Sequence, residues 1–125
     1  MRSISTEERH FLQEARGPTI FYRRDETAQE WSTVVNLLSE HVYISVDLDV
    51  FDPSMMAAVG TPEPGGMRWR EVLDLLHAVA MKRHIVGFDV TELSPREGPE
   101  ACAYTAAQLV HKLIGYATSL PNSWK

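Results

Sequence analysis

Three aspartates lie within six residues, at positions 47, 49 and 52, directly after the apolar run Val42–Val46. Carboxylate oxygens are the ligands that hard divalent cations prefer. Asp47 and Asp49 are two residues apart, so in an extended chain they point to the same side, about 6–7 Å apart. A counter-charge would relieve their repulsion at a buried site, and a metal ion is the simplest one. Asp47 and Asp49 are therefore predicted metal ligands.

The alternative is that a strand-end aspartate only caps the turn that follows, and for a single residue this interpretation stays open. Asp52 belongs to an Asp-Pro step, which favours turn initiation, so we expect it to have a structural role.

Two further acids, Asp89 and Glu92, follow the second dense apolar run, Ile85–Phe88. The carboxyl ends of parallel strands meet at one edge of a sheet, where ligands bind. Glu92 is a candidate metal ligand, base or partner of a cationic substrate. Asp89 is expected to make internal hydrogen bonds.

The spacing of apolar residues predicts the elements that position these acids. A long loop is expected over Phe51–Gly66, which is rich in proline and glycine. Helices alternate with strands, which predicts a single α/β domain over residues 1–125, with a parallel sheet and flanking helices. The expected helices are Ser5–Ala15, Thr27–Glu40, Trp69–Arg83 and Pro99–Ala117, and the expected strands are Thr19–Tyr22, Val42–Val46 and Ile85–Phe88.

Composition limits the classes of protein. The chain has 125 residues, of which 44% are hydrophobic, and a net charge of −5. This size supports one core, and the acidity argues against nucleic-acid or anionic-membrane partners and favours cationic ligands. Cys102 is the only cysteine, so an internal disulfide is excluded and a cytoplasmic location is expected.

The other reactive residue types give weaker signals. The histidines show no close ligand spacing, so none is predicted as a metal ligand. Cys102 lies in an alanine-rich segment without an obvious base and is expected to be a small buried hydrophobic residue. The five histidines are His10, His41, His77, His84 and His111.

Four segments carry a family resemblance. Ser45–Pro53 and Gly60–Gly66 resemble the signature of the manganese ureohydrolases, which include arginase, agmatinase, formimidoylglutamase and guanidinobutyrase. Gly87–Pro95 resembles a later strand of that family, and Tyr104–Ile114 its last helix. The loop form Val-Gly-Thr-Pro-Glu-Pro-Gly-Gly is most similar to that of agmatinase.

The resemblance implies a fold and a reaction. The fold would be the C-terminal part of the arginase-like α/β fold. Asp47 and Asp49 would be catalytic residues that ligate a binuclear manganese centre, Glu92 would receive the substrate guanidinium, and Thr61 would line the pocket. Two metals would activate a hydroxide that attacks the guanidinium carbon of a substrate such as agmatine, giving an amine and urea.

The family's earlier ligand motifs, Gly-Gly-Asp-His and Asp-Ala-His-x-Asp, do not occur in this sequence. The chain therefore resembles the C-terminal half of an agmatinase, and we expect weak manganese binding, no appreciable activity alone and homo-oligomerisation.

Two alternatives stay open. One is a non-catalytic remnant subdomain that acts through self-association. The other is a haloacid-dehalogenase-like phosphatase, because Asp47-x-Asp49 resembles its nucleophile and acid pair, although the required later lysine and Asp-Asp pair are not found in a credible place.

Overall fold

The computed structural model describes residues 5–14, 19–21 and 31–119. The chain divides into two compact units, residues 1–30 and 31–125, and each is described by itself. In the first unit, α1 (Thr6–Glu14) is the helix expected from the Ser-Thr-Glu-Glu start. The Glu8 backbone N–H donates to Ser5 Oγ (3.1 Å) and the Ser5 N–H donates to Glu8 Oε2 (2.8 Å), so the helix begins with a capping box.

The strand expected over Thr19–Tyr22 is wrong for residues 19–21, which have no regular structure. β-branched and aromatic residues favour a strand, but a strand forms only where a neighbour accepts its hydrogen bonds. Residues 22–30 lie outside the described part of the chain. The start of the helix expected from Thr27 is among them.

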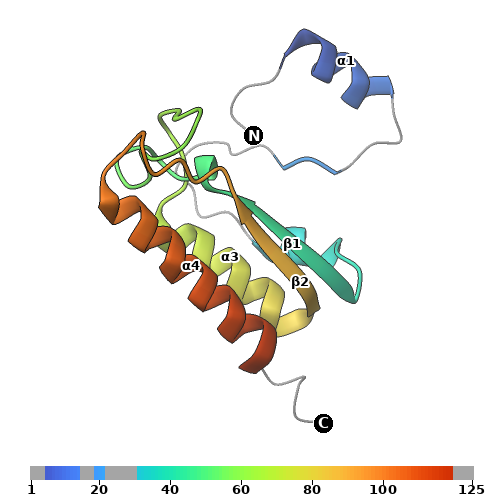
Figure 1. Cartoon of the computed structure of the whole chain (residues 1–125). Helices are drawn as coiled ribbons and strands as arrows, with labels where there is room; N and C mark the ends of the chain where they lie inside the picture. The colour runs from blue at the N-terminus through green and yellow to red at the C-terminus, as the bar shows by residue number, and fades with distance from the viewer. Residues whose placement is uncertain (1–4, 15–18, 22–30, 120–125) are drawn as a thin grey trace. The chain divides into compact units, whose positions relative to one another are not determined.

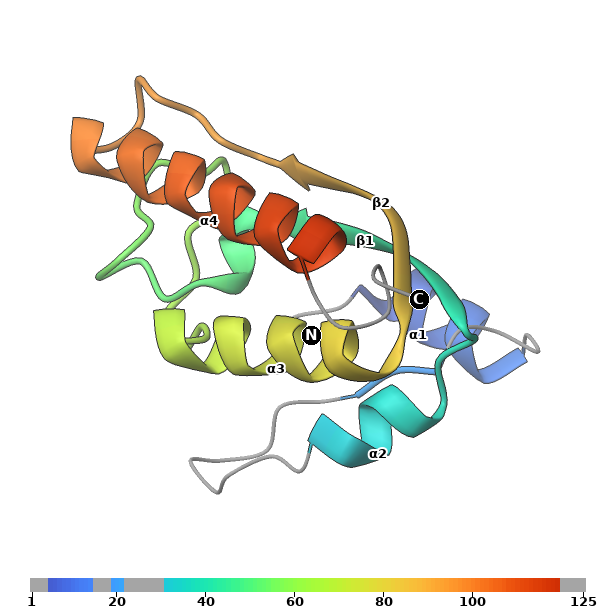
Figure 2. The ribbon, with the colours of Figure 1, turned by 90° about the horizontal axis from the view of Figure 1, so that it is seen from below.

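The second unit contains a parallel pair of strands, β1 and β2, linked by helix α3. Helices α3 and α4 lie side by side against one face of this pair, as the two perpendicular views show (Figures 1 and 2). The predicted α/β class, with a parallel sheet and flanking helices, is confirmed. The bounds are β1 (His41–Asp47), α3 (Trp69–Lys82), β2 (His84–Thr91) and α4 (Glu100–Ser119).

Alternation along β1 separates its two faces. Val42 and Val46 are buried towards the helices, whereas Tyr43 points to the other face and is 62% exposed. The core beneath the carboxyl half of the sheet combines strand, loop and helix residues, so the loop is part of the core. Its buried members are Val46, Leu48, Phe51, Met56, Ala58, Val59, Val72, Leu76, Cys102, Ala106, Leu109 and Leu113.

Helix α2 (Trp31–Asn36) ends four residues before the end expected at Glu40. Its last turn tightens, because the Leu38 N–H bonds to the carbonyl of Val35, three residues back, at 3.2 Å. Arg83, which directly follows α3, donates from Nη2 to the same carbonyl at 2.7 Å. A contact between elements therefore takes part in ending this helix.

The other two predicted helices are confirmed within two residues at each end. Pro99 directly precedes α4, where its missing N–H is not needed by the helix. Cys102 is buried in α4, as expected for a small hydrophobic residue. In the part of the chain that the structure describes, every helix is too short or too polar to cross a bilayer.

The long segment after β1 is a loop, as predicted, and hydrogen bonds close its base. The Met67 N–H donates to the Val50 carbonyl (2.7 Å), and the Asp52 N–H donates to the Met67 carbonyl (3.1 Å). Gly66 lies so close to the backbone of Phe51 and Asp52 that a Cβ there would overlap it. The two ends of the loop, at residues 50–52 and 66–67, therefore lie side by side.

Asp52 organises the start of this loop, which confirms its expected structural role. Its Oδ1 accepts the Ser54 N–H (3.0 Å) and the Ser54 hydroxyl, and its Oδ2 accepts the Gly65 N–H (2.9 Å). These bonds, the Ser54 hydroxyl first, favour the charged carboxylate and lower the pKa of Asp52 to about 2.

The close approach at Gly66 predicts a steep cost for any side chain. Gly66→Ala is expected to lower the free energy of unfolding by about 2 kcal/mol or more, because the backbone of Phe51 cannot move aside cheaply. The matched control is Gly115→Ala in α4, where no atom lies within 4 Å of an added Cβ. That change is expected to raise stability by about 0.5–1 kcal/mol. Urea denaturation measures both, and equal effects would contradict the packing described.

The lowered pKa of Asp52 predicts a dependence of stability on pH. The folded state binds this proton less readily than the unfolded state, so the contribution of Asp52 is present above the unfolded pKa near 4. It is lost as the pH falls towards about 2. The difference in urea midpoint between the wild type and Asp52→Asn should be largest above pH 5 and shrink towards pH 2. A difference that does not vary with pH would count against this role.

Candidate active site

The carboxyl ends of β1 and β2 meet at one edge, as the sequence predicts. Asp47 is the last residue of β1, and it pairs in register with Thr91, the last residue of β2. Glu92 follows Thr91 directly. Asp47 and Glu92 therefore come to the same edge, because the strands are parallel and end together.

The extended geometry expected for Asp47 and Asp49 is wrong. The chain turns at once into a short 3-10 helix, η1 (Leu48–Val50), and Asp47 caps it: its Oδ1 accepts the Asp49 N–H at 3.0 Å. A turn begins with N–H groups that lack a backbone partner, and an aspartate side chain satisfies one of them. Asp47 thus has a capping role, and this bond ties the two aspartates together.

Thr61, in the long loop, contacts Asp49. Its hydroxyl donates to Asp49 Oδ2 at 3.0 Å, so the loop contacts the second aspartate directly. The loop is also fixed to the segment after β2, because the Ser94 N–H donates to the Ala58 carbonyl at 2.8 Å. A Cβ on Gly98 would lie 2.7 Å from the Ala58 nitrogen, so this contact is tight.

Glu92 lies against this loop. A Cβ built on Gly60 would lie 3.6 Å from Glu92 Oε2, which places the carboxylate beside the residue that precedes Thr61. Glu92 has a φ of 66°, the only positive value among the described residues other than glycine. A glutamate in this region is strained by roughly 1 kcal/mol or more, and such strain is concentrated at functional sites.

Asp89 is held by hydrogen bonds within the sheet. It pairs with Ser45 across the sheet, and the Ser45 hydroxyl donates to Asp89 Oδ1 at 2.7 Å. A hydrogen bond to the same carboxylate raises the pKa of the Tyr43 hydroxyl. The expectation that Asp89 makes internal hydrogen bonds is confirmed.

The donor chemistry fits a hard divalent cation only in part. Asp47 and Asp49 supply carboxylates at adjoining positions, as a manganese or magnesium ion prefers. Within residues 5–14, 19–21 and 31–119, however, no three His, Cys, Asp or Glu side chains are arranged to hold one ion. These residues supply part of a ligand set rather than a complete one.

Sequence reasoning missed the contacts that anchor the loop. Met56, Ala58 and Val59 are almost fully buried, although they lie in a segment with no helix or strand. The signal was present as the apolar run Met55–Val59 within an otherwise proline- and glycine-rich stretch. Such a run in a loop indicates that the loop packs into the core.

The positive φ of Glu92 predicts that a glycine at this position gives a more stable protein than an alanine does. Glu92→Gly relieves the positive φ, whereas Glu92→Ala keeps the strain and removes the carboxylate. After the entropic cost of glycine, the Gly variant is expected to be more stable than the Ala variant by about 0.5–1 kcal/mol. Urea denaturation of both variants measures this. An Ala variant that is the more stable of the two would contradict the strained conformation.

Comparison with known proteins gives consistent matches. The model of the Arginase family matches residues 1–115. An N(1)-aminopropylagmatine ureohydrolase from Synechocystis is 32% identical over 118 residues, which cover 93% of this chain and 39% of the relative. An agmatinase from Pyrococcus horikoshii is 35% identical over 115 residues, covering 92% of this chain and 40% of the relative. The chain thus spans about two fifths of the length of these relatives.

Solved structures agree with the sequence matches. The arginase from Bacillus caldovelox has a TM-score of 0.77 at 27% identity, covering 91% of this chain and 40% of that one. The agmatine ureohydrolase of Thermoplasma volcanium has a TM-score of 0.60 at 36% identity, covering 70% of this chain and 30% of that one. The architecture, the signature segments and these matches agree, and the chain belongs to the arginase family.

Proposed function

We propose that this chain forms part of an agmatinase-like ureohydrolase, an enzyme that hydrolyses a guanidino compound such as agmatine to an amine and urea. Asp47 and Asp49 contribute carboxylates to a binuclear manganese site, and Glu92 receives the guanidinium. Family membership favours this function over the phosphatase alternative. The relatives named as agmatinase and N(1)-aminopropylagmatine ureohydrolase support the substrate class.

One observation carries the proposal: the hydrogen bond from Thr61 to Asp49, which brings the long loop onto the end of β1. The same loop places Gly60 beside the Glu92 carboxylate. Two segments that are far apart in the sequence, the end of β1 and the residue after β2, therefore present acids to one edge, and the loop contacts both. A shared acidic edge suits a cationic substrate together with divalent metals.

Each side chain has a distinct task in this proposal. Glu92 pairs with the planar guanidinium and orients its carbon, because a carboxylate matches two parallel N–H groups. Thr61 holds the Asp49 carboxylate in one orientation, as partners behind a metal ligand do. When bound, the manganese ions supply Lewis acidity and an activated water. This assigns Thr61 a positioning role beside the pocket-lining role that the resemblance implies.

We further propose that the chain alone is inactive and that other ligands complete its site. Among the described residues, no three His, Cys, Asp or Glu side chains are grouped so that they could hold one metal ion. The match covers 39% of the length of the Synechocystis relative. The remaining ligands would come from sequence outside these 125 residues or from a partner subunit. A cytoplasmic location and homo-oligomerisation belong to the same proposal.

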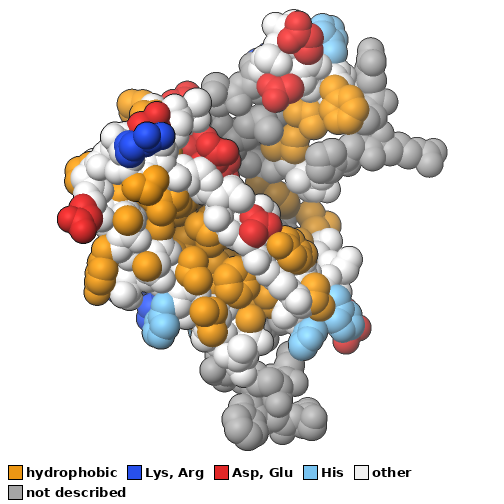
Figure 3. Space-filling model, viewed as in Figure 1, with side chains coloured by type: hydrophobic (Ala, Val, Ile, Leu, Met, Phe, Trp, Pro, Cys, Tyr) orange, Lys and Arg blue, Asp and Glu red, His pale blue; other side chains and the backbone are white. Residues whose placement is uncertain are grey.

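A second candidate function is a non-catalytic module that acts through self-association. Large apolar side chains are exposed on both sides of the second unit. Tyr43 and Val86, at 62% and 59% exposure, lie on β1 and β2, and Tyr104, at 69%, and Ile114 lie on α4. Figure 3 shows apolar side chains gathered over α4. Apolar side chains gathered on one surface, as over α4, are typical of an interaction site.

A manganese titration and a urea assay on the purified chain test the proposed function. Weak manganese binding is expected, to be abolished by Asp47→Asn with Asp49→Asn and kept by the control Asp74→Asn, an exposed aspartate on α3. With agmatine and manganese, urea release is expected to stay near background.

Each claim in these proposals has an outcome that would overturn it. Manganese binding that survives the double substitution would overturn the assignment of the aspartates. Turnover close to that of a complete agmatinase would overturn the inactivity of the isolated chain. Sedimentation of the same samples tests self-association, which belongs to both candidate functions, and a monodisperse monomer would contradict it.

A further inference from the structure

Two histidines face each other at the end of the sheet opposite the candidate active site. His41 is the first residue of β1, His84 is the first residue of β2, and the two are register partners. Their rings meet edge to face, with centroids 5.3 Å apart and planes at 76°. The two histidines are far apart in the sequence, so their spacing does not predict the pair. The parallel register brings them together.

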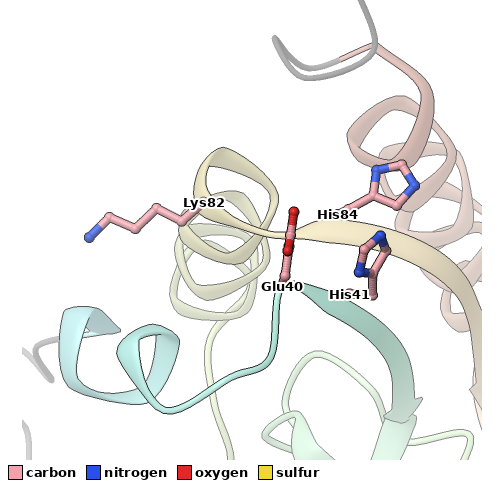
Figure 4. A pocket seen from close by; sticks show the side chains of 4 residues that line it. All are labelled: Glu40, His41, Lys82 and His84. Carbon is pink, nitrogen blue, oxygen red and sulfur yellow. The ribbon is translucent and has the colours of Figure 1, made fainter.

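The backbone holds the pair in place. The His84 N–H donates to the Glu40 carbonyl at 2.8 Å, which starts the ladder at this point. Glu40, His41, Lys82 and His84 line an open cavity of about 340 Å³. Figure 4 shows the two imidazoles next to each other, while the Lys82 side chain extends away from them. All four side chains are exposed, so a solute reaches them directly.

This geometry suits a borderline transition-metal ion. Neutral imidazole is a favoured ligand of zinc, copper and nickel, whereas hard cations prefer carboxylate oxygens. A tetrahedral zinc ion with Zn–N distances of about 2.0–2.1 Å needs its two nitrogens about 3.3 Å apart. The ring nitrogens lie on the ring perimeter, so two rings with centroids 5.3 Å apart can each turn one nitrogen towards the space between them. The Glu40 carboxylate adds negative charge beside the rings.

We infer that His41 and His84 form a two-imidazole binding site for Zn²⁺ or a similar borderline divalent cation. Water completes the coordination, since no third His, Cys, Asp or Glu in the described residues joins a common ligand set. The site is separate from Asp47 and Asp49. His41 and Asp47 are the first and last of the seven residues of β1, so about 20 Å separates them at roughly 3.3 Å per residue.

Metal at this site would join the starts of β1 and β2. The two ligands come together only in the folded chain, so the ion binds the folded state in preference to the unfolded one. Zinc at about 100 times its dissociation constant would then shift the folding equilibrium about 100-fold towards the folded state. The bound ion would stabilise the pairing of β1 with β2, and its binding requires neither substrate nor manganese.

Calorimetric titration of the full chain with zinc chloride tests the inference. Binding of one zinc ion is expected, and His41→Ala and His84→Ala are each expected to weaken it at least 10-fold. His111→Ala is the matched control, an exposed histidine on α4, and should leave the affinity unchanged within twofold. Asp47→Asn with Asp49→Asn should also leave zinc binding unchanged, which separates this site from the proposed manganese ligands.

Urea denaturation with and without zinc gives an independent readout. Zinc is expected to raise the midpoint of the wild type and of His111→Ala, and to leave those of His41→Ala and His84→Ala nearly unchanged. Far-UV circular dichroism checks that each variant is folded. Zinc affinity equal to wild type in both histidine variants would overturn the inference, and so would zinc binding that is lost only with the two aspartates.

Discussion

The parallel pairing of β1 with β2 is the constraint on which the second unit depends. The register runs from His41 opposite His84 to Asp47 opposite Thr91, so both ends of the two strands are aligned. Alignment at the carboxyl end brings Asp47 next to the start of the segment that holds Glu92. Alignment at the amino end brings the two histidines together. One backbone ladder therefore creates two chemically different edges.

The long loop packs against the acidic residues at the carboxyl edge of the sheet, Asp49 and Glu92. Its base is closed by bonds between Val50, Asp52 and Met67, and its far part is anchored to Asp49 through Thr61. Burial of Met56 and Val59 contributes the apolar stabilisation that an irregular segment needs to keep one conformation. Glu92 keeps its strained backbone conformation between two fixed points: Thr91 at the end of β2, and Ser94, whose N–H is bonded to the Ala58 carbonyl of the loop.

The two edges differ in ligand chemistry. The carboxyl edge presents acidic oxygens, which suit a hard cation or a guanidinium, and the amino edge presents imidazole nitrogens. This separation follows from the residue types at the two ends of the strands, with Asp47 and Glu92 at the first edge and His41 and His84 at the second. The exposed Tyr43 face between the edges, with Asp89 bonded to Ser45 and Tyr43, belongs to neither.

Secondary structure was predictable wherever local patterns were strong. The apolar runs at Val42–Val46 and Ile85–Phe88 identify both strands, and helical spacing identifies α3 and α4 to within two residues. Propensity alone failed at Thr19–Phe21, where a strand was expected and none forms in the described residues. It also failed at the end of α2, where a contact from Arg83 accompanies the end of the helix.

By itself, the sequence determined the class of fold, the family and the identity of the candidate acids, because each of these depends on residue types and on spacings of a few residues. Only the tertiary structure decided how those acids meet. It showed that Asp47 caps a turn, that Thr61 bonds to Asp49, and that His41 faces His84. The physical reason is the range of the interactions. Helical periodicity and turn chemistry act over a few residues, whereas register and loop anchoring join atoms that only packing brings together.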